Sequence, residues 1–153
     1  MVNFKLTSVP LSWKLLFTSA IIGMGITYLI LALHIYIDTN FKVSAIKQAY
    51  SGMEWIELTD HTHKYFPYYG IYIFAFALFI FVLGTSYPEW VKRLVVIIPN
   101  SLIVLDIASM WAIPYINADI FSWGLFLAGN FLALSFAIIA LLTLHDIWLR
   151  KTS

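Results

Sequence analysis

The chain has no cysteine among its 153 residues. Disulfide bonds, iron–sulfur clusters, thiolate zinc sites, covalently attached c-type haem and cysteine nucleophiles all require that sulfur, so the sequence excludes them. Charged residues are also scarce, at 11% of the chain, where a soluble domain has about 25%. The basic residues stand singly or in pairs, which argues against a nucleic-acid partner because a polyanion needs clustered positive charge.

Several motifs of catalysis and transport are absent as well. The sequence contains no P-loop, no nucleophile elbow, no H-E-x-x-H helix and no paired-carboxylate motif, so it gives no support to an NTPase or a hydrolase. It also lacks an internal repeat and the polar residues that would line a transport path, which disfavours a transporter acting alone. No residue is therefore assigned a catalytic role, and whether the protein is an enzyme stays open.

Apolar residues are abundant, and 61% of the chain is hydrophobic. Four runs are uncharged or nearly so: Leu15–Tyr36, Phe66–Gly84, Leu94–Ile116 and Ile120–Trp148. About 20 helical residues cross the roughly 30 Å of bilayer hydrocarbon, so each run can span a membrane. The first run is longer than the apolar core of a signal peptide, and no A-x-A cleavage site follows it. We therefore predict an all-α integral membrane four-helix bundle that forms a single domain, residues 1–153.

Basic residues indicate the orientation of the bundle. They gather at three places that alternating spans put on one side of the membrane: Lys5, Lys14, Lys92, Arg93, Arg150 and Lys151. Loops rich in lysine and arginine stay in the cytoplasm. We expect both termini to be cytoplasmic and the long loop of residues 37–65 to lie on the outer side, where Asp38, Glu54, Glu57, Asp60 and, in the short last loop, Asp119 also fall.

The long outer loop carries a helical pattern of its own. Apolar residues recur there at three- and four-residue spacing: Val43, Ile46, Tyr50, Met53 and Ile56. This periodicity predicts an amphipathic helix that lies flat on the membrane. Because proline is tolerated in the first turn of a helix, we expect Pro67 to begin the second span and residues 60–66 to form a non-helical lead-in.

Three of the four histidines fall on the outer side, His34 in the first run and His61 and His63 before the second. If residues 60–64 are extended, the side chains of His61 and His63 point to one face, where His34 can join them. A b-type haem would take His34 and either His61 or His63 as axial ligands. Copper or zinc would take all three, with Asp60 or Met53 completing the set. The third possibility is that no cofactor is bound and the histidines hydrogen-bond water and lipid headgroups.

The fourth histidine, His145, lies near the cytoplasmic end of the last run, beside Asp146 and ahead of Arg150. It has no histidine partner at its depth, so a second haem would lack a ligand pair. We expect His145 to form a helix-end ion pair or to interact with the helix dipole.

Asp106 is the only acidic residue well inside a predicted span. A carboxyl group there has to find partners or stay protonated, which makes it a candidate functional residue. Asn130 falls at a similar depth, and Thr27, Tyr28 and Ser109 can complete a hydrogen-bonded network. Such a network can bind a quinone headgroup or pass a proton, or it can lock the helices together. One acid and one amide are too little for a continuous proton relay, which favours the locking role.

Segments of the second half resemble a family of small four-span bacterial inner-membrane proteins. The resemblance rests on Pro88–Arg93, Ile97–Pro99, Leu105–Trp111 and Leu144–Trp148, with the H-x-H segment of residues 61–63 before the second span. Members of that family accompany multihaem cytochrome and respiratory genes, which implies a bacterial inner-membrane location and larger respiratory subunits as partners. The four-span plan with histidines also resembles, in architecture alone, the cytochrome b anchor subunits of quinone-linked dehydrogenases.

Together these features favour a small membrane subunit of a respiratory or other redox complex. Its outer histidines would hold haem b or a metal ion, and Asp106 with Asn130 would anchor the helices or contact a quinone. The alternatives are a cofactor-free scaffold for larger subunits and an outer-face copper or zinc binding protein. All three place the chain in contact with the lipid bilayer.

Overall fold

The computed structural model describes residues 5–150, except for the side chains of residues 68, 69 and 71. This part of the chain forms helices and no strand: η1 (Leu6–Ser8), α1 (Leu11–Thr39), α2 (Val43–Tyr50), α3 (Trp55–Phe66), η2 (Pro67–Ala75), α4 (Phe76–Gly84), α5 (Glu89–Tyr115) and α6 (Ala118–Trp148). The predicted all-α fold class is confirmed. Lys151, one of the basic residues of the tail, lies outside the described residues.

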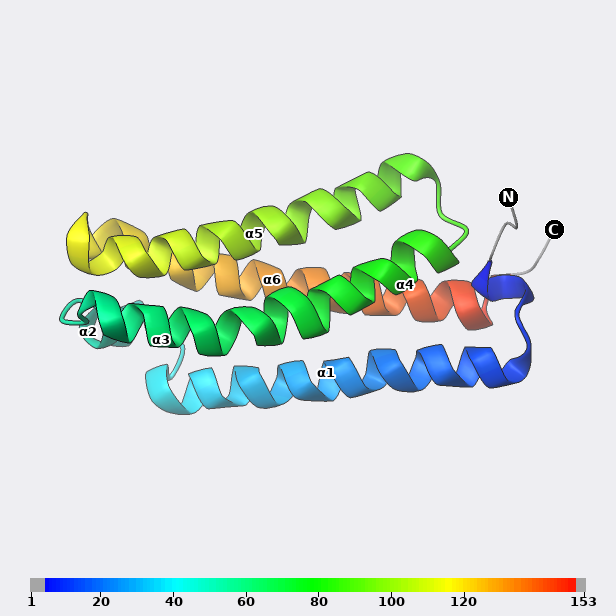
Figure 1. The fold of residues 1–153 in the computed structure, drawn as a ribbon, viewed down its shortest axis with the longest axis horizontal. Coiled ribbons are helices and arrows are strands. Elements are labelled where there is room, and N and C mark those ends of the chain that lie inside the picture. The colour runs from blue at the N-terminus through cyan, green and yellow to red at the C-terminus, as the bar shows by residue number, and fades with distance from the viewer. Residues whose placement is uncertain (1–4, 151–153) are drawn as a thin grey trace.

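Figure 1 shows α1, α5, α6 and the run from α3 to α4 side by side along the long axis of the molecule. The elements α3, η2 and α4 form one continuous rod, because the backbone stays right-handed helical at both junctions. The φ and ψ angles are −59° and −37° at Pro67, and −67° and −44° at Phe76. The stretch between these junctions is π-helical, which is a wider turn than the α-helix on either side.

The expected non-helical lead-in over residues 60–66 is wrong, because α3 runs through it. A capping box starts this helix, in which the Glu57 side chain accepts the backbone N–H of Glu54 at 2.9 Å and the Glu54 side chain caps in return. Pro67 lies inside the rod, at the first position of the π-helical stretch, and does not begin a span. A proline removes one backbone donor and crowds the preceding turn, and we attribute the wider turn to both effects.

Helix α2 confirms only the first half of the amphipathic helix predicted for the loop. Its Ile46 is buried, but the helix ends at Tyr50, so Met53 falls between helices and Ile56 belongs to α3. Helix α2 packs across α6, with further contacts to α1 and α5. It lies over one end of the bundle (Figure 1).

The two ends of the bundle differ in chemistry. Helices α1 and α5 begin, and α4 and α6 end, at the end that carries Lys14, Lys92, Arg93 and Arg150, which we call the basic end (Figure 1). The opposite end carries α2, α3 and three of the histidines, and we call it the histidine end.

The outer surface of the bundle is apolar. Of the 29 residues of α1, only Ile21 is buried. Among the described residues, α1, α5 and α6 are long and apolar enough to cross a membrane, and the apolar part of the α3–η2–α4 rod, Tyr72–Gly84, is shorter. The core lies between the long helices and the α3–η2–α4 rod, around Phe74, Phe81 and Ile139.

Candidate functional site

The most unusual buried group is the hydroxyl of Ser109 on α5. Ser109 is 0% exposed, and within residues 5–150 its Oγ has no hydrogen-bond partner. Two other buried hydroxyls donate to the carbonyl four residues earlier in their own helix, Ser122 at 2.6 Å and Thr143 at 2.7 Å. Leaving a buried polar group unpaired lowers stability by about 1–3 kcal/mol, so the Ser109 hydroxyl carries a cost that its neighbours in the described chain do not offset.

Ser109 is buried because α5 and α6 approach closely at its level. It faces Gly124 of α6, where an added Cβ would lie 2.6 Å from Ser109 Oγ. One turn nearer the basic end, Asp106 faces Gly129, where an added Cβ would lie 3.9 Å from Asp106 Oδ1. The two glycines therefore provide the space that the polar side chains of α5 occupy, as small residues do between membrane helices.

A second buried atom without a partner belongs to His61 on α3. In the described part of the chain, its Nδ1 is buried and forms no hydrogen bond. The His61 ring lies 5.9 Å from the Tyr50 ring, edge on, and 5.7 Å from the ring of Tyr65, one helical turn along α3. These aromatic contacts hold the imidazole in place and leave Nδ1 unsatisfied.

Tyr50 of α2 interacts electrostatically with Asp106. Burial raises the pKa of the Tyr50 hydroxyl to about 12, and the negative charges of Tyr65, Asp106 and Asp38 add to the rise. Tyr50 therefore stays neutral at physiological pH and can donate a hydrogen bond. We call Tyr50, His61, Asp106 and Ser109 the interior polar cluster. It brings hydrogen-bonding groups from α2, α3 and α5 to the half of the bundle nearer the histidine end.

The structure does not form the whole network predicted around Asp106. Asn130 and Thr27 are exposed, and each donates to the carbonyl four residues earlier in its own helix, at 2.7 Å and 3.0 Å. Tyr28 does face the interior, where its ring stacks on Phe136 at 5.6 Å. Equal depth was not enough to bring Asn130 to Asp106, because depth does not fix which face of a helix a residue occupies.

The helical conformation of α3 rearranges the predicted histidine cluster. His61 and His63 are two residues apart on a helix, hence about 200° apart around its axis, so they do not share the face expected of an extended segment. His34 is exposed, and its Nε2 lies 3.5 Å from Asp38 Oδ2. Among the described residues, no three His, Asp or Glu side chains form a group that could hold a metal ion. Haem b on His34 with His61 or His63, and copper or zinc on these histidines with Asp60, stay predictions.

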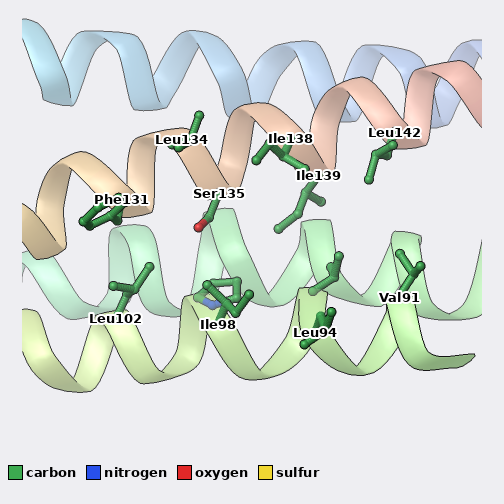
Figure 2. A pocket seen from close by; sticks show the side chains of 12 residues that line it. Val91, Leu94, Ile98, Leu102, Phe131, Leu134, Ser135, Ile138, Ile139 and Leu142 are labelled. Atoms are coloured by element: carbon green, nitrogen blue, oxygen red, sulfur yellow. The ribbon is translucent and has the colours of Figure 1, made fainter.

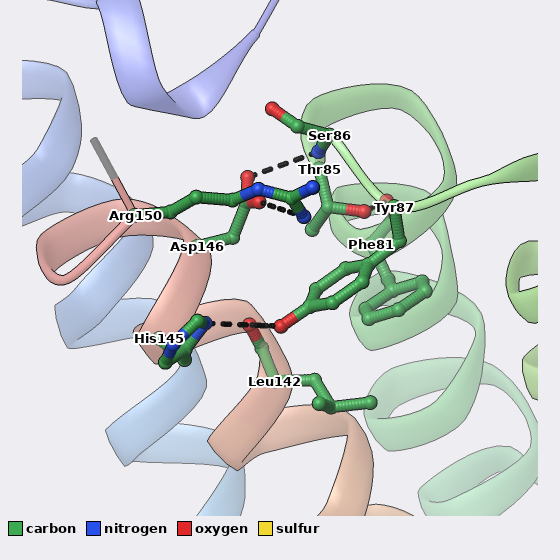
Figure 3. Close-up of polar contacts among 8 residues, drawn as sticks. All are labelled: Phe81, Thr85, Ser86, Tyr87, Leu142, His145, Asp146 and Arg150. Atoms are coloured by element: carbon green, nitrogen blue, oxygen red, sulfur yellow. Dashed lines mark hydrogen bonds and ion pairs between the residues drawn. The ribbon is translucent and has the colours of Figure 1, made fainter. Parts of the chain in front are cut away.

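Sequence reasoning missed the role of Asp146, which is 0% exposed at the basic end (Figure 3). Its Oδ2 accepts the backbone N–H of Ser86 at 3.0 Å, and its Oδ1 lies 3.4 Å from Arg150 Nη1. The ion pair at this helix end therefore belongs to Asp146 and not to His145, whose Nδ1 lies 3.1 Å from the Tyr87 hydroxyl. The four-residue spacing of Asp146 and Arg150 was the signal available in the sequence. These contacts tie α6 to the loop before α5.

A groove of about 400 Å³ separates α5 and α6 on the side of the interior polar cluster that faces the basic end. Its walls run from Val91 to Leu102 on α5 and from Phe131 to Leu142 on α6. Figure 2 shows the side chains of the two helices facing each other across it. Ser135 contributes the single polar side chain of the lining.

Most of the chain matches one known protein family. A family model described as a transmembrane helical domain, Aq_1264_TM, matches residues 37–153. The chain belongs to this family. No curated protein and no solved structure matches the chain.

The Aq_1264_TM domain covers α2 to α6 and leaves almost all of α1 outside the match. The four residues of the interior polar cluster lie within it, and His34 lies before it. The family and the three long apolar helices identify a membrane protein whose exposed surface contacts lipid. The predicted inner-membrane location, cytoplasmic termini and association with respiratory genes stay predictions.

Proposed function

We propose that the protein is a small membrane subunit of a redox complex that binds a quinone ring in the interior polar cluster. The observation that carries this proposal is the pair of buried atoms without partners in the described chain, Ser109 Oγ and His61 Nδ1. A quinone is a lipid-soluble ring with two carbonyl oxygens, each of which accepts a hydrogen bond. Ser109 donates from its hydroxyl, and His61 donates in the tautomer that carries its proton on Nδ1.

Tyr50 and Asp106 suit the same ligand in both of its redox forms. The neutral Tyr50 hydroxyl is a further donor for a quinone carbonyl. The carboxylate of Asp106 is an acceptor for the hydroxyl of a hydroquinone. The aromatic rings of Tyr50 and Tyr65, which already contact His61, provide an apolar wall for a flat ring.

The geometry supports a quinone better than a haem on the predicted histidines. A haem with two imidazole ligands needs both rings to face one iron atom. His34 is exposed and paired with Asp38, whereas the His61 ring packs between Tyr50 and Tyr65. A cofactor-free scaffold, in turn, leaves the unpaired Ser109 and His61 atoms without an explanation.

The test is a titration of the purified protein in detergent with a benzoquinone that has no tail, followed by the quenching of tryptophan fluorescence. We expect Ser109→Ala and His61→Phe to weaken binding about three- to tenfold each, the value of one neutral hydrogen bond. Ser122→Ala is the matched control, because Ser122 is equally buried but its hydroxyl is already paired within α6. It should bind as the unaltered protein does.

Unchanged affinity in both Ser109→Ala and His61→Phe contradicts the quinone site. A reduced-minus-oxidised spectrum of the same preparation tests haem b, because an α band that disappears in His34→Ala and His63→Ala assigns the histidines to haem instead. Metal analysis tests copper or zinc in the same way. A colourless, metal-free protein that binds no quinone and co-purifies with larger subunits favours the scaffold.

A further inference from the structure

The groove between α5 and α6 is long, narrow and apolar. It extends over 11 residue steps on each helix, from Val91 to Leu102 and from Phe131 to Leu142, which corresponds to about 16 Å along the axis. Its volume of about 400 Å³ falls within the range of small-molecule sites. The lining is aliphatic or aromatic except for Ser135 (Figure 2).

The groove and the interior polar cluster are consecutive parts of one helix interface. On α5, Pro99 and Leu102 line the groove, and Asp106 and Ser109 follow at spacings of four and three residues, so all four lie on one face. The two helices are in close contact where Ser109 meets Gly124, and they separate toward the basic end (Figure 1). The inner end of the groove at Leu102 is therefore one helical turn from Asp106.

We propose that this groove holds the apolar tail of an isoprenoid quinone whose ring occupies the interior polar cluster. The inference rests on the proposed quinone site and names its substrate class as quinones with a long tail. A tail that leaves the ring at Asp106 enters the groove at Leu102 and follows it toward the basic end.

The cations near the basic end are mostly engaged within the chain, so they do not single out a phospholipid as the occupant. A phospholipid chain in the groove would bring its phosphate to the level of Val91, where it would need a free cation. Lys92 donates to the Val82 carbonyl at 2.7 Å, Arg93 pairs with Glu89, and Arg150 pairs with the buried Asp146. The two arginines are thus paired with carboxylates, whereas Lys92 bonds a neutral carbonyl and keeps its charge, so a bound phospholipid is one of the outcomes that the experiment distinguishes.

The experiment compares two probes that share one ring, a tail-free ubiquinone ring and the same ring with a decyl tail, in detergent-solubilised protein. We expect the decyl compound to bind more tightly. Ser135→Phe fills the groove and should remove that advantage, weakening the decyl compound about fivefold while leaving the tail-free ring unchanged. Ser101→Phe is the matched control, because Ser101 is an exposed serine of α5 that does not line the groove. Ser101→Phe should still bind the decyl compound more tightly than the tail-free ring.

Ile98→Phe narrows the groove from the other helix and replaces Ser135→Phe if that variant does not fold. Ser135→Ala removes only the hydroxyl and should leave the binding of both probes unchanged, because the tail is apolar. The tail groove is rejected if the unaltered protein binds the two probes equally well, while the ring site stands. It is also rejected if Ser135→Phe and Ile98→Phe both still bind the decyl compound more tightly than the tail-free ring. The loss of a co-purified phospholipid from Ser135→Phe, with no change in quinone binding, overturns it in favour of a lipid chain. The absence of binding of either probe to the unaltered protein rejects the proposed function itself.

Discussion

Replacing Ser109 by alanine is expected to stabilise the ligand-free protein, although truncating a buried side chain usually has the opposite effect. The hydroxyl is 0% exposed and unpaired in the described chain, so its removal relieves a penalty of about 1–3 kcal/mol. The loss is the dispersion energy of one oxygen atom, at about 0.1–0.2 kcal/mol for each heavy-atom contact. The free energy of unfolding should therefore rise by about 1 kcal/mol.

Ser122→Ala separates the effect of the unpaired hydroxyl from the general effects of the exchange. Both serines are fully buried in long apolar helices, and both exchanges gain the same helix propensity, about 0.5 kcal/mol. Ser122 differs because its hydroxyl donates to the Ala118 carbonyl at 2.6 Å, a bond that contributes about 1 kcal/mol. The two variants should differ by about 2 kcal/mol, measured by reversible unfolding in mixed micelles and followed by circular dichroism.

The contact between Ser109 and Gly124 provides an internal check. An alanine at position 124 would place its Cβ 2.6 Å from Ser109 Oγ but 3.4 Å from Ser109 Cβ. Gly124→Ala should therefore destabilise the protein by about 1–3 kcal/mol when Ser109 is present and by much less when it is combined with Ser109→Ala. If Ser109→Ala is as destabilising as Ser122→Ala, or if Gly124→Ala has the same effect in both backgrounds, the Ser109 hydroxyl is not an unpaired, tightly packed group.

Three further predictions concern other parts of the bundle. Asp146→Asn should lower the free energy of unfolding by about 1–3 kcal/mol because Asp146 is fully buried. Arg150→Gln should lower it by less, because the Arg150 side chain is 38% exposed. Equal thermal unfolding curves for the two variants would contradict this. Gly84→Ala should be destabilising, because its Cβ would lie 2.6 Å from Cγ of the buried Leu6. Thermal unfolding of the double variant should show that Gly84→Ala has much less effect when Leu6→Ala is already present. Burial raises the pKa of Tyr50 from 10.0 to about 12, so its contribution to stability is complete below pH 10 and is lost as the pH rises through 12. In Tyr50→Phe, the free energy of unfolding should therefore fall less steeply with pH over this range. A slope equal to that of the unaltered protein would argue against the burial of Tyr50.

The predicted site stays a prediction, but the structure shows where its residues lie. Asp106 and Tyr28 face the interior, and Ser109 lies on the same face of α5 as Asp106. Asn130 and Thr27 satisfy their side chains within their own helices, so no polar partner was needed and their depth was a poor guide. The unpaired state of Ser109 has no signature in the sequence, because it depends on Gly124 of another helix.

The histidine cluster shows where local patterns were misjudged. A proline at position 67 predicts a helix start there, but a capping box at Glu54 and Glu57 starts the helix earlier, and this helix includes His61 and His63. The sequence gives only part of that signal, Glu57 at the third helical position, because Glu54 is not one of the usual N-cap residues. What the sequence does not show is that the rod continues past Pro67 through a π-helical stretch.

The sequence by itself determined that this protein is helical and lies in a membrane, because long uncharged runs can satisfy their backbone hydrogen bonds in lipid only within helices. It also determined that Asp106 points inward, since a carboxyl group cannot face hydrocarbon. Only the tertiary structure decided which polar groups meet, because helix rotation and the close approach at Gly124 depend on packing between distant segments. The same packing opens the α5–α6 groove beside the cluster and leaves Ser109 and His61 without partners in the described chain.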